Sequence, residues 1–308
     1  MVEPNPTPDI QSTTPGSPRR LSDPPVLRKL NLDSFIRYKS ILSVLIYIAI
    51  LGIAIGIKWS YHTFDAEKYF YDTASYASVA DLPLTTPQFW AGLRPFTLPL
   101  LYKLLGVTSA NYKDLWVMQR VYLVQSSLSL VSWAILGVVF ASIARTRWVR
   151  PLIFGMVLAF SLVYDISRWD LLLLSESIAF SLFALMLGGW VGLLTMPLSW
   201  RKSPRAYLVL VCVVIITLLY SFTRDSNPYF IVMAAAVFVL VSLFRNTGLP
   251  RKIVIIYLVA VALVFIAQEA SSNASNRWQL YMYDHIALRF TDTPEFVDYF
   301  ARAGMPIS

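Results

Sequence analysis

The chain has a single cysteine and only two histidines among its 308 residues. Cys212, being alone, cannot form an internal disulfide. His62 and His285 lie far apart and match no spacing typical of zinc ligands. The sequence also contains no Walker loop, no GxGxxG motif and no heptad repeat. These absences exclude a disulfide scaffold and predict no cofactor, and they leave a requirement for a divalent metal open.

Charge is scarce as well. Only 14% of the residues are charged and 56% are hydrophobic, whereas a soluble domain has about 25% charged and about 45–50% apolar residues. The composition therefore indicates a protein embedded in lipid. A formal net charge of +8 is sometimes the mark of a nucleic-acid-binding protein. Here the basic residues occupy short tracts between apolar segments, so we expect no nucleic acid partner.

The N-terminal segment, residues 1–38, is rich in Pro, Ser and Thr and has little to bury. This composition predicts a disordered tail. The first apolar run starts near Ile41, after a polar leader that is too long for a cleavable signal peptide. We therefore expect the tail to stay in the cytoplasm.

Seven apolar runs follow the tail, and a spanning helix needs about 20 such residues. The runs cover residues 41–57, 115–143, 151–164, 169–196, 207–222, 229–244 and 253–268. We expect an all-α fold, a polytopic transmembrane helix bundle of about seven spans over residues 39–268. A long loop, 58–114, would join the first two spans, and residues 269–308 would form a polar C-terminal segment.

Basic residues predict which side of the membrane each loop faces. With seven spans, loops 145–150, 200–205 and 245–252 lie on the same side as the tail, and each carries three basic residues and no acid. This distribution satisfies the positive-inside rule. We therefore predict a multi-pass protein of the cell membrane with a cytoplasmic N-terminus. The 58–114 loop and the C-terminal segment would lie outside.

The long loop contains the first candidate site. Aromatic and apolar residues around 69–80 suit a helix lying in the membrane interface, and a second short apolar stretch, 97–105, follows Arg94. Asp72 and Tyr76 are four residues apart and share one helix face. A carboxylate held there beside Arg94 could deprotonate an acceptor hydroxyl. The alternative is that Asp72 only caps or solvates the helix.

Glu176 lies in the apolar run 169–196, at an expected depth of about two turns inside the outer end of its span. An acid in a span costs roughly 2.5–3.5 kcal/mol on insertion scales, so it should have a partner or face a wet cavity. It would then either mark a functional site or form a structural ion pair between spans.

Three arginines lie near the predicted outer ends of spans: Arg120, Arg168 and Arg224. The guanidinium group suits bidentate recognition of phosphate oxygens, and a lipid phosphate would lie at this depth. Snorkelling to ordinary phospholipid explains any one of them, but explains three less well when acids accompany them.

In these features the chain resembles the GT-C superfamily of membrane glycosyltransferases that use polyprenyl-phosphate sugars, which includes aminoarabinose transferases and protein O-mannosyltransferases. The resemblance covers roughly residues 40–268 and depends on the order of weak motifs. These are an acid followed four residues later by Tyr-Ala (Asp72, Tyr76), an Arg-Pro pair (Arg94), a Leu-Leu-Ser-Glu-Ser run (Glu176) and a span ending in Thr-Arg (Arg224).

The resemblance implies that a lipid-linked sugar donor enters from the outer leaflet, with its phosphate held by Arg94 and Arg224. Arg120 and Arg168 are further candidates for phosphate binding. Asp72 would be the general base that activates an acceptor hydroxyl, giving inversion at the anomeric carbon. The acceptor would be a glycan, a lipid or a protein. Tyr76 and Glu176 would support this group from within the membrane.

Two departures from the family pattern stand out. Many members of the superfamily have an Asp-Glu pair where this chain has Asp72-Thr73. Asp65 or Glu67 are therefore alternatives for the catalytic role of the second acid. Relatives also carry further spans or a soluble domain, whereas this sequence stops within a polar segment, which predicts a truncated or divergent member.

Two other classes of function are compatible with a polytopic chain. The first is a lipid or solute transporter, similar to a flippase, but the sequence has no internal repeat and its polar residues gather on one side. The second is a non-catalytic membrane scaffold in which the charges form only interhelical pairs.

Overall fold

The computed structural model describes residues 25–64, 68–201, 203–244, 249–277, 279 and 293–304. The chain divides into two units, residues 1–45 and residues 46–308. The described part of the first unit is the beginning of helix α1 (Pro25–Phe64), and the site discussed below lies in the second.

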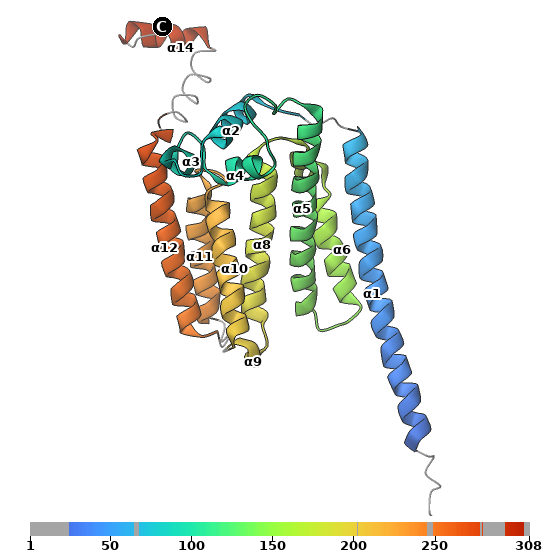
Figure 1. The fold of residues 1–308 in the computed structure, drawn as a ribbon. Coiled ribbons are helices and arrows are strands. Elements are labelled where there is room, and N and C mark those ends of the chain that lie inside the picture. Colours follow the sequence, from blue (N-terminus) through green and yellow to red (C-terminus); the bar gives the residue numbers. More distant parts are fainter. Residues whose placement is uncertain are drawn as a thin grey trace, which may run out of the picture. The chain divides into compact units, whose positions relative to one another are not determined.

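All regular elements among the described residues are helices, apart from one isolated parallel bridge between Lys68 and Leu172. The long helices after α1 are α5 (Leu115–Ile143), α6 (Val149–Ser161), α8 (Ser175–Thr195), α10 (Pro204–Ser221), α11 (Asn227–Phe244) and α12 (Arg251–Ala274) (Figure 1). The short helices are α2 (Tyr71–Asp81), α3 (Pro87–Ala91), α4 (Thr97–Leu104), α7 (Tyr164–Ser167), the 3-10 helix η1 (Arg168–Leu171), α9 (Leu198–Arg201) and α14 (Pro294–Arg302).

In the described part of the chain, five helices are long and apolar enough to cross a membrane: α1, α5, α8, α10 and α12. A sixth crossing is present if α6 and the α7–η1 segment, which is bent by 61° from it, count as one span. The protein is thus a membrane-embedded helical bundle with five to six helices able to span. The predicted number of seven is not confirmed. A helix as short as α6 extends only about 20 Å, less than the hydrocarbon core, and the apolar part of α11, Asn227–Ser242, is also shorter than a full span.

Helix α1 begins inside the segment predicted to be a disordered tail. It starts at Pro25, so residues 25–38 are drawn as helix, and disorder of the tail stays a prediction. The sequence offers a reason, because no glycine or proline interrupts residues 26–51 and proline is well tolerated at the first helical position. Residues 1–24 lie outside the described part of the chain.

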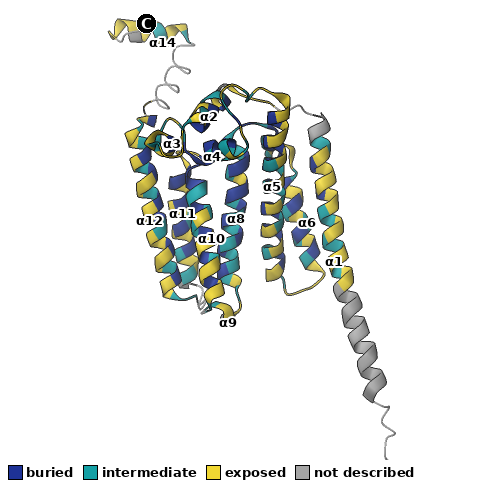
Figure 2. Ribbon diagram, in the orientation of Figure 1, coloured by how far each residue is buried: buried dark blue, intermediate teal, exposed yellow. Residues whose placement is uncertain are grey.

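Helix α8 is the centre of the packing. It contacts α5 on one side and α10 on the other, α5 also packs on α6, and α12 packs on α10 and α11. Buried residues make up 44% of the apolar window of α8 but only 11% of that of α1. The outer helices expose large apolar side chains (Figure 2), for example Ile53, Val138 and Leu263. Such an apolar outer surface fits a lipid environment.

Helices α8 and α10 approach each other closely at Gly189. A Cβ atom added there would overlap Cγ2 of Val213 on α10. Glycine therefore permits the contact between the two helices that carry part of the candidate site.

The short helices α2, α3 and α4 gather at one end of the bundle, which we call the site end, and α9 lies at the opposite end (Figure 1). Buried apolar residues of α2 and α4, among them Ala77, Leu98 and Tyr102, join the core built by α5, α8 and α10. The C-terminal ends of α5, α8 and α11 all lie at the α9 end (Figure 1). The described residues of the predicted basic loops follow these helix ends, and the side of the membrane that each end of the bundle faces stays a prediction.

Candidate functional site

Helix α2 is fixed to the bundle by its first turn. The backbone N–H of Phe70 donates to Thr73 Oγ1 at 2.9 Å, and the Thr73 hydroxyl donates to the carbonyl of Leu173 at 2.9 Å. Thr73 is fully buried. The buried Thr73 hydroxyl therefore anchors α2 to the residues just before α8.

The segment before α8, residues 168–174, receives these bonds, and we call it the connector segment. Lys68 N–H donates to Leu171 O and Leu173 N–H donates to Lys68 O, each at 3.1 Å, which forms the bridge between Lys68 and Leu172. The Tyr102 hydroxyl donates to Leu173 O at 2.8 Å. The connector segment thus holds α2, α4 and the start of α8 in one arrangement.

Asp72 forms an ion pair with Arg94 at the surface of the site end. Arg94 also donates through Nε to Ser75 Oγ at 2.7 Å, and its guanidinium carbon lies 5.0 Å from the centre of the Tyr76 ring. The predicted proximity of Asp72, Tyr76 and Arg94 is confirmed. The Asp72 side chain is 53% exposed, so a substrate can reach its carboxylate.

Glu176 and Arg224 form a second ion pair, with Arg224 Nη1 3.1 Å from Glu176 Oε1. Tyr76 lies between the two pairs. Its ring contacts Arg94, its hydroxyl donates to Ser175 Oγ at 3.4 Å, and Ser175 donates to Glu176 Oε2 at 3.5 Å. We call this set the polar network; it consists of Asp72, Ser75, Tyr76, Arg94, Ser175, Glu176 and Arg224. It brings together α2, the loop before α4, the start of α8 and the turn after α10.

The predicted depth of Glu176 is wrong. Helix α8 begins at Ser175, so Glu176 lies in the first turn rather than about two turns inside the span. The leucines at 171–174 continue the apolar run without continuing the helix, and hydropathy alone does not distinguish the two. A carboxylate at this position is favoured by the helix dipole as well as by Arg224.

Burial raises the pKa of the Tyr76 phenol above its usual value of 10.0. The hydrogen bond with Ser175 and the charge of Arg94 lower this pKa, but by less than burial raises it. Tyr76 is therefore a neutral hydrogen-bond donor at physiological pH. It provides a polar link between the two carboxylates without adding a charge.

Two of the predicted phosphate-binding arginines have other partners. Arg120 Nη1 donates to Leu105 O at 2.8 Å, and its guanidinium lies 4.4 Å from the centre of the Trp116 ring. Arg168 lies 3.8 Å from Asp165 and also contacts the Trp169 ring. Neither set of contacts belongs to the polar network. Of the alternative acids, Asp65 and Glu67 lie outside the described residues.

Sequence reasoning missed two further ion pairs near the network. Lys58 Nζ lies 2.6 Å from Asp170 Oδ2, and both side chains are buried. Arg277 pairs with Asp225 at 3.1 Å and donates to Gly92 O at 2.7 Å. For the first pair, the sequence shows only that Lys58 follows one apolar run and that Asp170 lies at the start of another. Charged residues commonly flank apolar runs, so this pattern does not predict an ion pair.

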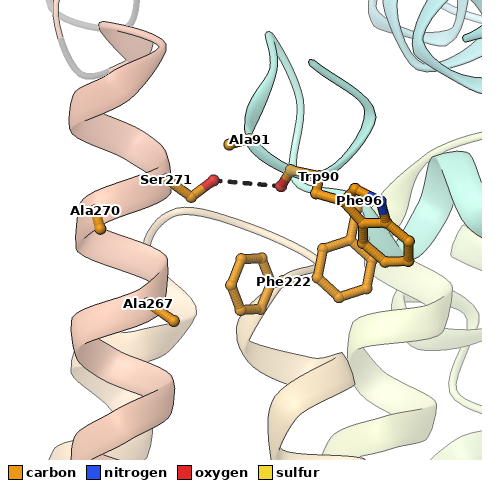
Figure 3. A pocket seen from close by; sticks show the side chains of 7 residues that line it. All are labelled: Trp90, Ala91, Phe96, Phe222, Ala267, Ala270 and Ser271. Atoms are coloured by element: carbon orange, nitrogen blue, oxygen red, sulfur yellow. Dashed lines mark hydrogen bonds between the residues drawn. The ribbon is translucent and has the colours of Figure 1, made fainter. Parts of the chain in front are cut away.

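An apolar pocket at the site end has a volume of about 370 Å³. Its lining consists of Trp90, Ala91, Phe96, Phe222, Ala267, Ala270 and Ser271 (Figure 3). The Phe96 and Phe222 rings pack with centroids 4.6 Å apart. Phe96 follows Arg94 by two residues and Phe222 precedes Arg224 by two, so the walls of the pocket belong to the segments that carry both arginines of the network.

Among the described residues, no group of three or more His, Cys, Asp or Glu side chains could hold a metal ion.

Comparison with known protein families, with curated proteins and with solved structures finds no match. Function is therefore inferred from the polar network, the apolar pocket and their place at one end of a membrane bundle.

Proposed function

We propose that the protein is an inverting membrane glycosyltransferase of the GT-C type, which moves a sugar from a polyprenyl-phosphate donor to an acceptor hydroxyl. One observation carries this proposal. At the site end of a lipid-embedded bundle, the accessible carboxylate of Asp72 is connected through a few side chains to two arginines, Arg94 and Arg224. Carboxylate and guanidinium groups are what deprotonation of a hydroxyl and binding of a phosphate require.

In the proposed reaction the acceptor oxygen attacks the anomeric carbon, the bond from that carbon to the phosphate oxygen breaks, and Asp72 takes the hydroxyl proton. The polyprenyl phosphate leaves with the electron pair of the broken bond. Arg94 and Arg224 stabilise the negative charge on the phosphate, as guanidinium groups do for phosphoryl oxygens. Attack on the face opposite the phosphate inverts the anomeric configuration.

The apolar pocket supports an amphiphilic donor. A phosphate near Arg94 and Arg224 would have its first isoprenoid units beside Phe96 and Phe222, because these residues are two positions away in the same segments. Burial of apolar surface there adds affinity roughly in proportion to area. The rest of the chain would lie against the membrane lipid.

The positive-inside rule supports an outer-face location for the site end, because the helix ends that the basic loops follow lie at the α9 end. The acceptor would therefore be a glycan, a lipid or a protein at the outer surface of the cell membrane, with the N-terminus in the cytoplasm. No cofactor is needed for this chemistry, and a metal requirement is a question for the assay.

The test compares two aspartates of the same helix. Asp72→Asn removes the proposed base, whereas Asp81→Asn changes an exposed residue that accepts a hydrogen bond from Ser109 N–H at 3.1 Å. Purified protein in liposomes is assayed with a panel of radiolabelled polyprenyl-phosphate pentoses and hexoses and with outer-envelope acceptors. We expect Asp72→Asn to lower transfer by about 10²–10⁴-fold, the range of a general base.

Asp81→Asn should transfer at close to the unmodified rate. If Asp72→Asn accumulates in the membrane and transfers as well as Asp81→Asn does, Asp72 is not the base. If no sugar donor in the panel is used by the unmodified protein, the glycosyltransferase proposal itself fails.

A second candidate is a non-catalytic scaffold, favoured by the fact that both carboxylates of the polar network already have a guanidinium partner. The double exchange Glu176→Arg with Arg224→Glu separates the two functions. A scaffold would regain stability and cellular function in the double variant, because the ion pair is restored. A glycosyltransferase would regain stability without transfer, because the phosphate-binding charge has moved.

A further inference from the structure

We propose that the buried ion pair Lys58–Asp170 positions the polar network. The pair fixes the connector segment, and the connector segment in turn fixes the carboxylates of Asp72 and Glu176. This inference rests on the proposed function for its chemical consequence, but its structural content is independent of any reaction.

The pair is built into the core. The Lys58 and Asp170 side chains are 6% and 4% exposed. Lys58 also donates to Ser129 Oγ on α5 at 2.8 Å, and Ser177 on α8 donates to the other carboxylate oxygen, Oδ1, of Asp170. Four elements, α1, α5, η1 and α8, therefore meet at one carboxylate.

Asp170 stands directly before the part of the connector segment that receives the other bonds of the site. Leu171 and Leu173 pair with Lys68, and Leu173 O also accepts hydrogen bonds from Thr73 and Tyr102. Thr73 follows Asp72 in α2. Glu176 stands on the same chain six residues after Asp170, beside Ser177. A displacement of Asp170 thus moves the supports of Asp72 and Glu176 together.

Apart from the Lys58–Asp170 pair, few interactions within the connector segment itself hold it in place. It is a short 3-10 helix followed by an extended stretch, so it lacks the hydrogen bonds of a continuous α-helix. Helix α1, which supplies Lys58, is the least buried of the candidate spans. A buried ion in a span is costly unless it is paired. The cost of separating the charges therefore holds Lys58 and Asp170 together and, with them, α1 and the connector segment.

A disulfide can report the position of the connector segment without any activity assay. Residues paired across neighbouring strands lie about 5 Å apart, within the about 4.4–6.8 Å between Cα atoms that a disulfide spans. The reporter is Lys68→Cys with Leu172→Cys in a Cys212→Ala background. The rate of oxidative cross-linking is measured in membranes, in the full chain.

Asp170→Asn and Lys58→Met each leave one buried charge without its partner, so we expect the initial cross-linking rate to fall at least about tenfold. The matched control is Asp165→Asn, which removes an exposed carboxylate five residues earlier and should leave the rate unchanged. Asp170→Glu, which keeps the charge, should restore most of the rate. In the transfer assay, the same order of variants should hold for kcat.

Cross-linking of Asp170→Asn at the rate of Asp165→Asn would overturn the proposal. If Asp170→Asn does not accumulate, the double variant Lys58→Met/Asp170→Leu replaces it. This variant removes both charges and fills the space, and cross-linking at the unmodified rate would again overturn the proposal. Reduced cross-linking in a protein that transfers no sugar would support positioning and refute only the proposed function.

Discussion

Arginines at the two ends of the bundle have different partners. At the α9 end, Arg150 donates to Ala144 O at 3.0 Å and Arg201 donates to Met196 O at 2.7 Å, so these side chains bind main-chain carbonyls. At the site end, Arg94 and Arg224 pair with carboxylates. Arginine near a membrane surface often satisfies backbone carbonyls or snorkels. A carboxylate partner therefore distinguishes a candidate site better than the arginine itself does.

The same criterion separates arginines that share the site end. Arg120 bonds a carbonyl oxygen of Leu105 and so resembles the arginines of the α9 end. Arg168 has a carboxylate partner, Asp165, but that carboxylate is 79% exposed, whereas the Glu176 partner of Arg224 is 17% exposed, and exposed pairs contribute little. We accordingly expect Arg94 and Arg224, and not Arg120 or Arg168, to matter for a phosphate ligand.

The largest expected effect concerns the side of the membrane that each end of the bundle faces. In a Cys212→Ala background, Ser109→Cys labels the loop before α5 and Ser199→Cys labels α9, both at exposed positions. A membrane-impermeant maleimide on intact cells should modify only the first, and both after permeabilisation, because the basic loops stay inside. Modification of the second alone would reverse the orientation and remove the outer-face site.

The next largest effect concerns phosphate binding. Arg94→Gln removes a charged donor, and charge-assisted hydrogen bonds contribute about 1.5–3 kcal/mol, so kcat/KM for a polyprenyl-phosphate sugar should fall about ten- to hundredfold. Arg120→Gln, the control, should change it by less than about twofold, the scale of a surface contact. Equal losses in the two variants would show that a carboxylate partner does not identify the functional arginines.

A pH series tests the neutral phenols of the site end. Burial raises the pKa of Tyr76 above 10.0 and that of Tyr102 well above it. Below pH 10 both phenols are protonated in the folded and unfolded states, so they make no pH-dependent contribution. Above pH 10 only the unfolded phenols ionise, so the free energy of unfolding should decline by up to about 1.4 kcal/mol per pH unit for each phenol.

Chemical unfolding in detergent between pH 8 and pH 11 measures this decline. Tyr102→Phe should flatten it, whereas Tyr164→Phe, at an exposed position, should not. An unchanged slope in Tyr102→Phe would mean that other groups cause the loss of stability at high pH.

The smallest expected effect is that of the Tyr76 hydroxyl. Tyr76→Phe removes a long hydrogen bond to Ser175 but keeps the ring beside Arg94, so transfer should fall by no more than about twofold. Tyr76→Leu also removes the cation–π contact, worth about 0.5–1 kcal/mol at a partly exposed site, and should cost about two- to fivefold. A loss with Tyr76→Phe as large as with Asp72→Asn would indicate that the phenol itself takes part in the reaction.

Part of the site could be predicted from local sequence. The four-residue spacing of Asp72 and Tyr76 places them on one face of α2, and an arginine in the same loop is an obvious partner. The partner of Glu176 could be limited to a few arginines, because an acid among apolar residues needs one. Choosing Arg224 from three candidates required the turn after α10, whose path depends on how α8 and α10 pack.

The parts that could not be predicted depend on non-local structure. The leucines at 171–174 have the hydropathy of a span but form the extended end of the connector segment, because they bond to Lys68, Thr73 and Tyr102 instead of continuing a helix. The helices α2 to α7 lie between Lys58 and Asp170 in the sequence, so their pairing follows only from the fold. The role of Thr73 as an anchor likewise follows only from the fold, because its partner Leu173 lies 100 residues further along the chain.

The close approach of α8 and α10 at Gly189 has a consequence for evolution and engineering of this chain. Glu176 lies in the first turn of α8 and Arg224 lies in the turn after α10, so the ion pair joins the ends of two helices that are in contact at Gly189 and Val213. Valine has little rotamer freedom in a helix, so a single methyl at position 189 would work as a wedge. It would push α8 and α10 apart at a position remote from the polar network. The distance between Glu176 and Arg224 would then change, although no residue of the network has been substituted.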